Sequence, residues 1–218
     1  MVMSQDNKTN SGSNKSARDR LLDSAEELFC EHGFDDTSVR DLAAAADCNI
    51  ASVNYYFGSK ENLYVEMFRR YMSRLLDEHI ENIRKAMNSE QLTLEQLIRM
   101  MVVLALRSLD SDSGERPMLK MMVREVLNPH LKAAIGINEL VGKFFTELHK
   151  AIIKLCPGLK SETGLLCIYS LDGIIMHALL FSEHYPELYS ELTTNELIEH
   201  IVRFSKAGIQ VYTERKSE

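Results

Sequence analysis

The sequence predicts an all-α fold of about nine helices. Apolar residues recur at spacings of three and four from residue 16 to about residue 212, whereas the period-two alternation of strands does not recur. The 218 residues include only 4 prolines and 10 glycines, so long helices meet few breakers. This length suffices for a sizeable core and fits a small N-terminal module followed by a larger helical domain.

Residues 1–15 are expected to form a disordered tail. They are rich in Ser, Asn, Thr and Gln, contain no apolar run, and resemble neither a signal peptide nor a transit peptide. A first helix follows, in which the pairs Leu21-Leu22 and Leu28-Phe29 flank Ala25. A second helix starts at about Val39, because Ser38 and Asp41 have the spacing of a capping box.

A short polar turn at residues 47–49 leads into the third helix, which we expect Asn49 to cap. In this helix Ile50, Val53 and Phe57 can point inward. The residues left on or near the other face are uncharged: Ala51, Ser52, Asn54, Tyr55 and Tyr56. This layout is that of a helix-turn-helix, which places one helix in a DNA groove.

Gly58 and Ser59 then break and recap the chain, so that Lys60 falls in the first turn of a long helix. The helix macrodipole disfavours a cation at this position. A bound phosphate would reconcile the conflict, because helix-end N–H groups and the ammonium would both face it. The alternative is a helical hairpin in a core, with half-buried tyrosines and a solvated Lys60.

Helical periodicity and breakers divide the rest of the chain into further helices. The expected helices cover residues 59–87, 93–109 and 115–127, a segment from about Pro129 to Leu155, and residues 161–182 and 194–212. Residues 110–114 are expected to form a loop.

The N-terminal segment resembles the TetR/AcrR family of transcriptional regulators over roughly residues 16–68. The resemblance rests on the leucine pairs, Ala25, Gly33, residues 37–43, the run Tyr55-Tyr56-Phe57 and the run Ser59-Lys60-Glu61. It implies a helix-turn-helix DNA-binding domain at residues 16–62 and a ligand-binding and dimerisation domain at residues 63–218. One departure is Asn54, where many members have an aromatic residue, so a relative's sequence preference cannot be transferred.

The resemblance also implies roles for single residues. Ser38, Arg40, Tyr56 and Lys60 would hold phosphates, and Arg40 is also within reach of a base edge. Ser52, Asn54 and Tyr55 would face bases, since an asparagine can pair bidentately with adenine and a tyrosine can pack on a thymine methyl.

Charge runs against a broad basic DNA-binding surface. The net charge of the chain is −7, and residues 1–70 carry 8 Lys and Arg against 12 Asp and Glu. What remains is local placement: Lys8, Lys15, Arg18 and Arg20 cluster near the start of the first helix, while Arg40 and Lys60 lie further on. We therefore expect a modest number of phosphate contacts per subunit.

A ligand site is predicted in the larger domain, because methionines, which suit adaptable apolar pockets, cluster on two successive helices. Plain core packing is the alternative for each residue. The predicted ligand-binding residues are Met100, Met101, Leu104, Met118, Met121, Met122, Arg124, Glu125, Phe145, His149, Tyr169 and His177, and Asp172 is a further polar group in an apolar stretch. For the dimer interface the small residues Gly164, Ser170, Gly173 and Ala178 are predicted, and the resemblance implies a homodimer through the last two helices.

Other classes of protein find little support. The motifs H-E-x-x-H and G-x-S-x-G and a Gly-rich phosphate loop are all missing, so we expect no enzyme, cofactor or metal. Cys30, Cys48, Cys156 and Cys167 lack C-x-x-C spacing and are expected to be free thiols, with a redox role left open for Cys48. The most apolar stretch, residues 164–181, carries Asp172 and His177, which argues against a membrane span.

The expected protein is a cytoplasmic repressor that binds palindromic double-stranded operator DNA and is released by a small hydrophobic or amphipathic effector; an activator, or a helical adaptor, is the alternative.

Overall fold

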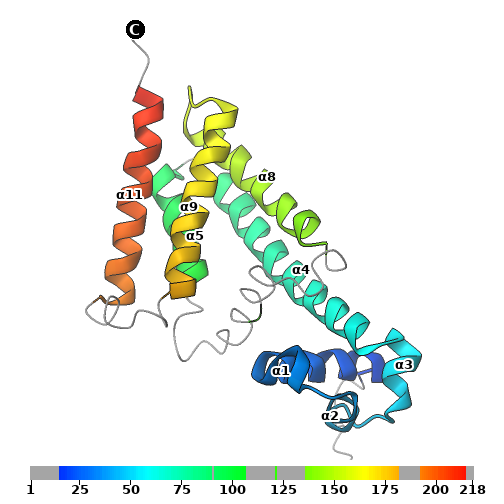
Figure 1. The fold of residues 1–218 in the computed structure, drawn as a ribbon. Helices are drawn as coiled ribbons and strands as arrows, with labels where there is room; N and C mark the ends of the chain where they lie inside the picture. The colour runs from blue at the N-terminus through cyan, green and yellow to red at the C-terminus, as the bar shows by residue number, and fades with distance from the viewer. Residues whose placement is uncertain (1–14, 90, 107–120, 122–135, 182–191, 215–218) are drawn as a thin grey trace, which may run out of the picture. The chain divides into compact units, whose positions relative to one another are not determined.

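The computed structural model describes residues 15–89, 91–106, 121, 136–181 and 192–214, and Figure 1 shows their helices. Within these ranges the chain forms eight helices and no strand, which confirms the all-α prediction. The chain divides into two compact units, Met1–Met67 and Phe68–Glu218, and the division falls inside one long helix. The functional division at residue 62 stays a prediction, and the predicted tail, the loop at 110–114 and most of the helix at 115–127 lie outside the described residues.

The first unit consists of α1 (Ala17–Asp36), α2 (Val39–Ala45), α3 (Ala51–Phe57) and the start of α4 (Lys60–Met87). Leu21, Leu22, Ala25 and Phe29 form the buried stripe of α1, because helical spacing places them on one face. The rings of Phe29 and Tyr64 meet edge to face, with their centroids 5.0 Å apart. This packing ties α1 to α4 within the unit.

The short helices begin and end where the sequence predicts, with two corrections. Ser38 and Asp41 form the predicted capping box: Asp41 N–H donates to Ser38 Oγ and Ser38 N–H donates to Asp41 Oδ2, both at 3.1 Å. Ile50, not Asn49, precedes α3, while Asn49 Oδ1 accepts a hydrogen bond from Ala51 N–H at 2.9 Å. Ile50 is 51% exposed and therefore does not point inward, since it lies outside the helix whose face is buried.

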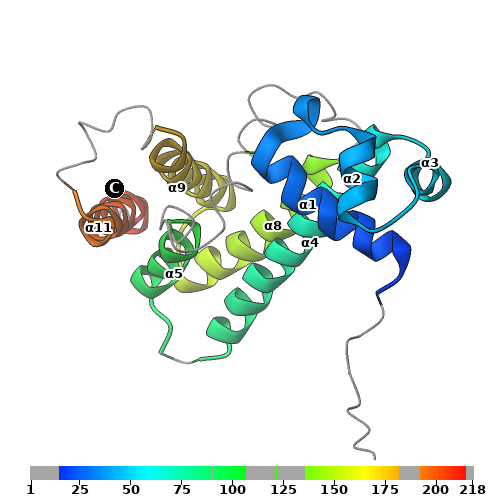
Figure 2. The same ribbon diagram turned by 90° about the horizontal axis from the view of Figure 1, so that it is seen from below.

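The second unit packs the remaining part of α4 with α5 (Leu94–Leu106), α8 (Ile137–Leu155), α9 (Ser161–Phe181) and α11 (Thr194–Glu214). Figures 1 and 2 show α9 beside α11 and α5, and α8 beside α9. The core contains Leu97, Val102, Ile152, Ile168 and Val202, each at most 1% exposed. A helix uninterrupted from Pro129 to Leu155 is wrong, because Gly136 adopts a left-handed conformation (φ 65°) directly before α8.

Charged side chains add a second link between α5 and α11. Arg99 forms a bidentate ion pair with Glu199, and Lys206 Nζ lies 2.7 Å from Glu95 Oε2. Arg99 and Glu95 are also 3.6 Å apart, so the four groups alternate in sign along the contact. The Lys206 and Arg99 side chains hold the pKa of Glu95 below its usual value. Such exposed pairs add modestly to an interface that apolar packing already forms.

Helix α9 is long and apolar enough to cross a membrane by length and composition. The core helix of a soluble protein passes the same test, and Leu171 and Ile175 of α9 are buried within this chain. Within the described residues all four cysteines are free: Cys156 and Cys167 are buried, while Cys30 and Cys48 are half-buried. Burial, with Glu26 nearby, raises the pKa of Cys30 to about 12, which makes this thiol unreactive.

The surroundings of two glycines on α9 predict different effects of an alanine substitution on the free energy of unfolding. A Cβ on Gly164 would lie 2.9 Å from Ile153 Cδ1 and 3.3 Å from His149 Nε2, whereas a Cβ on Gly173 would meet no atom of the described residues within 4 Å. We expect Gly164→Ala to lower the free energy of unfolding by about 1 kcal/mol, the lower end of typical overpacking costs. Gly173→Ala should leave it unchanged or raise it by up to about 1 kcal/mol, the helix-propensity difference.

Urea denaturation followed by circular dichroism measures both free energies of unfolding. Equal destabilisation by the two substitutions would contradict the packing described for α9, because only Gly164 is crowded.

Candidate nucleic-acid interface

The outer face of α3 is the surface that the sequence points to. Val53 is fully buried and Phe57 is 7% exposed, so these two side chains anchor the helix. On the opposite side Ala51, Asn54 and Tyr56 are exposed, and Tyr55 is 81% exposed. As the sequence predicts, α3 carries no charge and its exposed polar and aromatic side chains are accessible to a ligand. Ser52, which was also expected on this face, is half-buried.

The two tyrosines form one structural feature on this face. The rings of Tyr55 and Tyr56 pack edge to face with their centroids 4.9 Å apart, and the ring of Tyr56 lies 6.4 Å from that of Phe57. Edge-to-face packing at this distance is a preferred arrangement of aromatic pairs. The two rings therefore form one exposed apolar surface that also carries two hydroxyl groups.

The turn between α2 and α3 is held by backbone contacts. Cys48 N–H donates to Ala43 O at 2.9 Å, and Asp47 adopts a left-handed conformation with φ 49°. Asparagine and aspartate tolerate this region better than most residues, so the turn suits its sequence.

Ser38 and Arg40 lie at the start of α2 and differ in what they contact. The Ser38 hydroxyl donates to Asp41 Oδ2 at 2.5 Å, and this bond with that from the Ser38 backbone holds the pKa of Asp41 below its usual value. Arg40 is exposed and makes no hydrogen bond or ion pair within the part of the chain that the structure describes. A phosphate contact from either residue stays a prediction.

The ammonium of Lys60 is bound within the chain, whereas the sequence led us to expect it to face a phosphate. Its Nζ donates to Phe34 O at 2.8 Å and to Thr37 O at 2.9 Å, and it lies 4.2 Å from the centroid of the Phe34 ring. The ammonium thus binds carbonyl oxygens of the segment that follows Gly33, where a φ of 83° and ψ of 177° break the helical backbone within α1. The electrostatic conflict that we expected a phosphate to relieve is relieved inside the chain.

The cations near the start of α1 are also engaged within the unit. Lys15 Nζ lies 2.5 Å from Asp23 Oδ2, and Arg18 forms an ion pair with Glu66. Arg20 donates to backbone carbonyls of Lys15, Ala46 and Asp47. Sequence reasoning missed these internal contacts; the available signal was the position of both arginines in the first turn of a helix, which the macrodipole disfavours just as it does for Lys60.

The predicted ligand-binding residues do not come together in one described pocket. Met101 and Met121 are buried, whereas Tyr169 is 57% exposed. His177 is exposed, and Met100, Leu104, Phe145 and His149 are half-buried. Met118, Met122, Arg124 and Glu125 lie outside the described residues. Two local contacts stand out: the rings of Phe145 and Tyr169 have centroids 5.8 Å apart, and His149 Nε2 lies 2.9 Å from Ser161 O.

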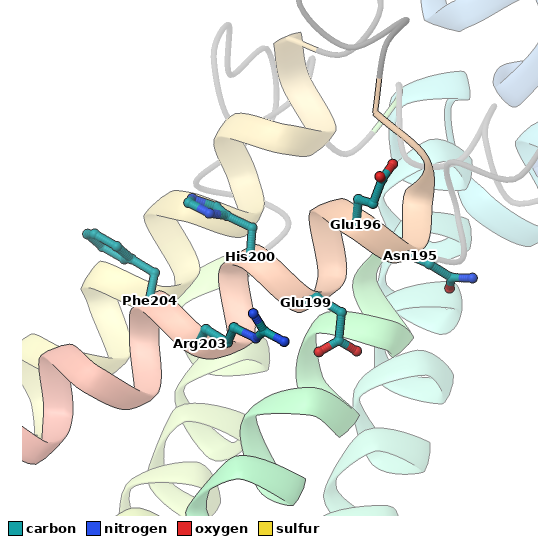
Figure 3. Close-up of a pocket in the computed structure, with 6 residues that line it drawn as sticks. All are labelled: Asn195, Glu196, Glu199, His200, Arg203 and Phe204. Atoms are coloured by element: carbon teal, nitrogen blue, oxygen red, sulfur yellow. The ribbon is translucent and has the colours of Figure 1, made fainter.

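Two pockets border α11 instead. One, of about 650 Å³, is lined by side chains that all project from α11, and Figure 3 labels them: Asn195, Glu196, Glu199, His200, Arg203 and Phe204. The other, of about 420 Å³, is a groove between α9 and α11, and it includes Ser170 of the predicted dimer interface. Neither is lined by a predicted ligand-binding residue.

The predicted dimer residues fall on two sides of α9. Ser170 and Gly173 are exposed, as an interface between subunits requires. Gly164 and Ala178 are buried within the chain, where Gly164 lies against α8, so the prediction is wrong for these two. Helix periodicity explains the error, because small residues recur on both faces of α9.

The capped helix, the turn and the anchored third helix together define a helix-turn-helix unit. Residues 21–67 match the family model described as bacterial regulatory proteins, tetR family. "Probable HTH-type transcriptional regulator YttP" of Bacillus subtilis is 35% identical over 115 residues, 51% of this chain and 51% of that protein. "HTH-type transcriptional repressor KstR2" of Rhodococcus jostii is 38% identical over 81 residues, 37% of this chain and 39% of that protein.

The chain spans about half, or less, of the length of these curated relatives. A solved structure of a transcriptional regulator from Saccharomonospora viridis in complex with choline resembles the whole fold, with a TM-score of 0.68 at 18% identity over 88% of this chain and 97% of that chain. Over residues 21–67 the chain therefore carries a domain that is similar to the TetR family of bacterial regulatory proteins.

Proposed function

We propose that the protein is a transcriptional regulator that binds double-stranded operator DNA through the outer face of α3. The observation that carries the proposal is the exposure of Asn54, Tyr55 and Tyr56 on a helix fixed from behind by Val53 and Phe57. An uncharged face with an amide and aromatic rings suits the base edges of a major groove, where amides and methyl groups are read directly. Two relatives named as transcriptional regulators support this assignment.

Repression is the mode that we favour, because KstR2 is named a repressor. Activation is the alternative within the same class. A helical adaptor that binds no DNA would suit the acidic charge, but it offers no reason to expose Tyr55 and Tyr56 together. Enzymatic activity and a membrane location are not part of the proposal, which places the protein in the cytoplasm.

A homodimer would present two copies of α3 to one palindromic site. The groove between α9 and α11 is bordered by exposed apolar side chains: Leu166, Phe204, Val211 and Tyr212 are between 50% and 65% exposed. Exposed apolar surface of this kind marks protein contacts. Two recognition helices about 34–36 Å apart would reach successive major grooves.

A small effector would act on this dimer through the second unit. α4 contributes residues to both units, so a ligand that prefers one arrangement of the second unit can shift the recognition helices. Asp172 is the polar group that best suits ligand recognition: it is half-buried in an apolar helix and has no hydrogen bond or ion pair within the described residues. Burial raises the pKa of its carboxyl above the usual value.

A carboxylate without a partner in an apolar setting favours a cationic group on the effector. The Saccharomonospora viridis neighbour holds choline, a quaternary ammonium, which agrees with this chemistry. We therefore favour an amphipathic cation over a neutral lipid-like molecule.

The role of α3 predicts a loss of specific binding when its exposed side chains are shortened. Asn54→Ala and Tyr55→Ala should each weaken binding to a selected operator duplex about tenfold or more, since a good bidentate base contact contributes about 1–3 kcal/mol of discrimination. Binding to scrambled DNA should change little. Fluorescence anisotropy with both duplexes measures the two affinities, and Glu162→Gln, at an exposed position of α9, serves as the control. Unchanged operator affinity in both variants would refute the docking of α3.

The dimer predicts a matching stoichiometry. Sedimentation of the free protein at micromolar concentration should give twice the mass of one chain, and Phe204→Glu should shift the mass toward one chain, because it places a charge at the groove. A single-chain mass for the wild-type protein would contradict the proposed dimer.

The effector proposal predicts selective thermal stabilisation. Quaternary ammonium amphiphiles should raise the melting temperature more than uncharged amphiphiles of equal chain length. Asp172→Asn should remove this difference, while Glu162→Gln, an exposed acid on the same helix, should keep it. A difference that persists in Asp172→Asn would exclude Asp172 as the recognition group.

A further inference from the structure

The described part of the first unit contains five cationic Lys and Arg side chains: Lys15, Arg18, Arg20, Arg40 and Lys60. Four of them have partners inside the unit, and within the described residues only Arg40 has neither a hydrogen bond nor an ion pair. A DNA-binding unit that is also acidic would ordinarily keep its few cations available for phosphates. The use of four cations as internal partners therefore calls for a structural explanation.

Arg20 closes the turn that precedes α3. Its Nε donates to Ala46 O at 2.9 Å, Nη1 donates to Lys15 O at 3.1 Å, and Nη2 donates to Asp47 O at 3.3 Å. Nη2 also lies 3.5 Å from Cys48 Sγ. One planar guanidinium thus joins the start of α1 to the end of α2 and to the residues that lead into α3. A lysine could not reproduce this fork, because its ammonium is a single point of donation.

Arg18 acts at the other end of α3. Its guanidinium lies 5.3 Å from the centroid of the ring of Phe57, the last residue of α3, and pairs with Glu66 of α4. The contact therefore spans α1, the end of α3 and α4 within the first unit. Together the two arginines contact the chain before and after the recognition helix.

We infer that Arg18 and Arg20 are positioning residues that fix the two ends of α3, and that Arg40 is the arginine available to bind DNA phosphate. This inference rests on the proposed function and gives it a measurable electrostatic signature. Each phosphate contact contributes about −0.9 to the slope of log K against log salt. Arg40 alone gives a slope of about −2 for a dimer, whereas Arg18, Arg20 and Arg40 together would give about −5.

The experiment compares wild-type protein with Arg20→Lys, Arg20→Gln, Arg18→Gln, Arg40→Lys and Arg40→Gln. The probe is a duplex selected from random DNA by the wild-type chain, with a scrambled duplex beside it, and anisotropy is read from 50 to 300 mM salt. A partly unfolded variant lowers the affinity but not the slope, so the slope remains interpretable; circular dichroism reports the folded fraction.

We expect a wild-type slope near −2. Arg40→Gln should remove most of that slope, and Arg40→Lys should keep it. Arg20→Lys, Arg20→Gln and Arg18→Gln should reduce the ratio of selected to scrambled affinity about tenfold without changing the slope. If Arg20 contacted a phosphate, the positive charge retained in Arg20→Lys would preserve the ratio. A positioning role predicts instead that the ratio falls in Arg20→Lys as well.

Two results would overturn the inference. One is a wild-type slope of −5 or steeper, and the other is a decrease in slope for Arg20→Gln or Arg18→Gln as large as that for Arg40→Gln. Failure of the proposed function looks different, because the wild-type chain would then not distinguish the selected from the scrambled duplex at any salt concentration.

Discussion

The geometry of the recognition helix depends on α1. A helix of seven residues is too short to be stable alone, so α3 must be held by its surroundings. Val53 and Phe57 supply the apolar part of that support, and the guanidinium groups of Arg18 and Arg20 contact the chain at its two ends. Lys60 joins the end of α1 to the start of α4. The exposed face of α3 is therefore a product of contacts made behind it.

This arrangement explains how an acidic unit would carry the proposed DNA-binding surface. The Lys and Arg side chains that pair with Asp23, Glu66 and backbone carbonyls stabilise the fold of the first unit. The exposed face of α3, in contrast, carries no charge. Base edges are read by hydrogen bonds and apolar contacts, which need position more than net charge. In the proposed dimer, specificity would then depend on how accurately α3 is held and on how far apart the two copies of α3 lie.

The parts of the structure that short-range rules control could be predicted from the sequence. The capping box at Ser38, the break at Gly58 and the end of α8 at Cys156 follow from local backbone chemistry. The contacts of Arg20 with Ala46 and of Lys60 with Phe34 could not be predicted, because each joins residues that are 26 positions apart in the sequence. The faces of α9 were ambiguous for a related reason: Gly164 and Gly173 are alike in sequence, and only packing against α8 separates them.

The single free arginine of the first unit has a consequence for how such a protein would search a chromosome. Affinity for random DNA is almost entirely electrostatic, so a first unit in which Arg40 is the one Lys or Arg of the described residues without a partner would be retained weakly by non-operator sequence. It would slide over short stretches and spend much of its time unbound. Most copies would then remain free to meet an effector, and a small number of molecules per cell could respond quickly when that effector appears.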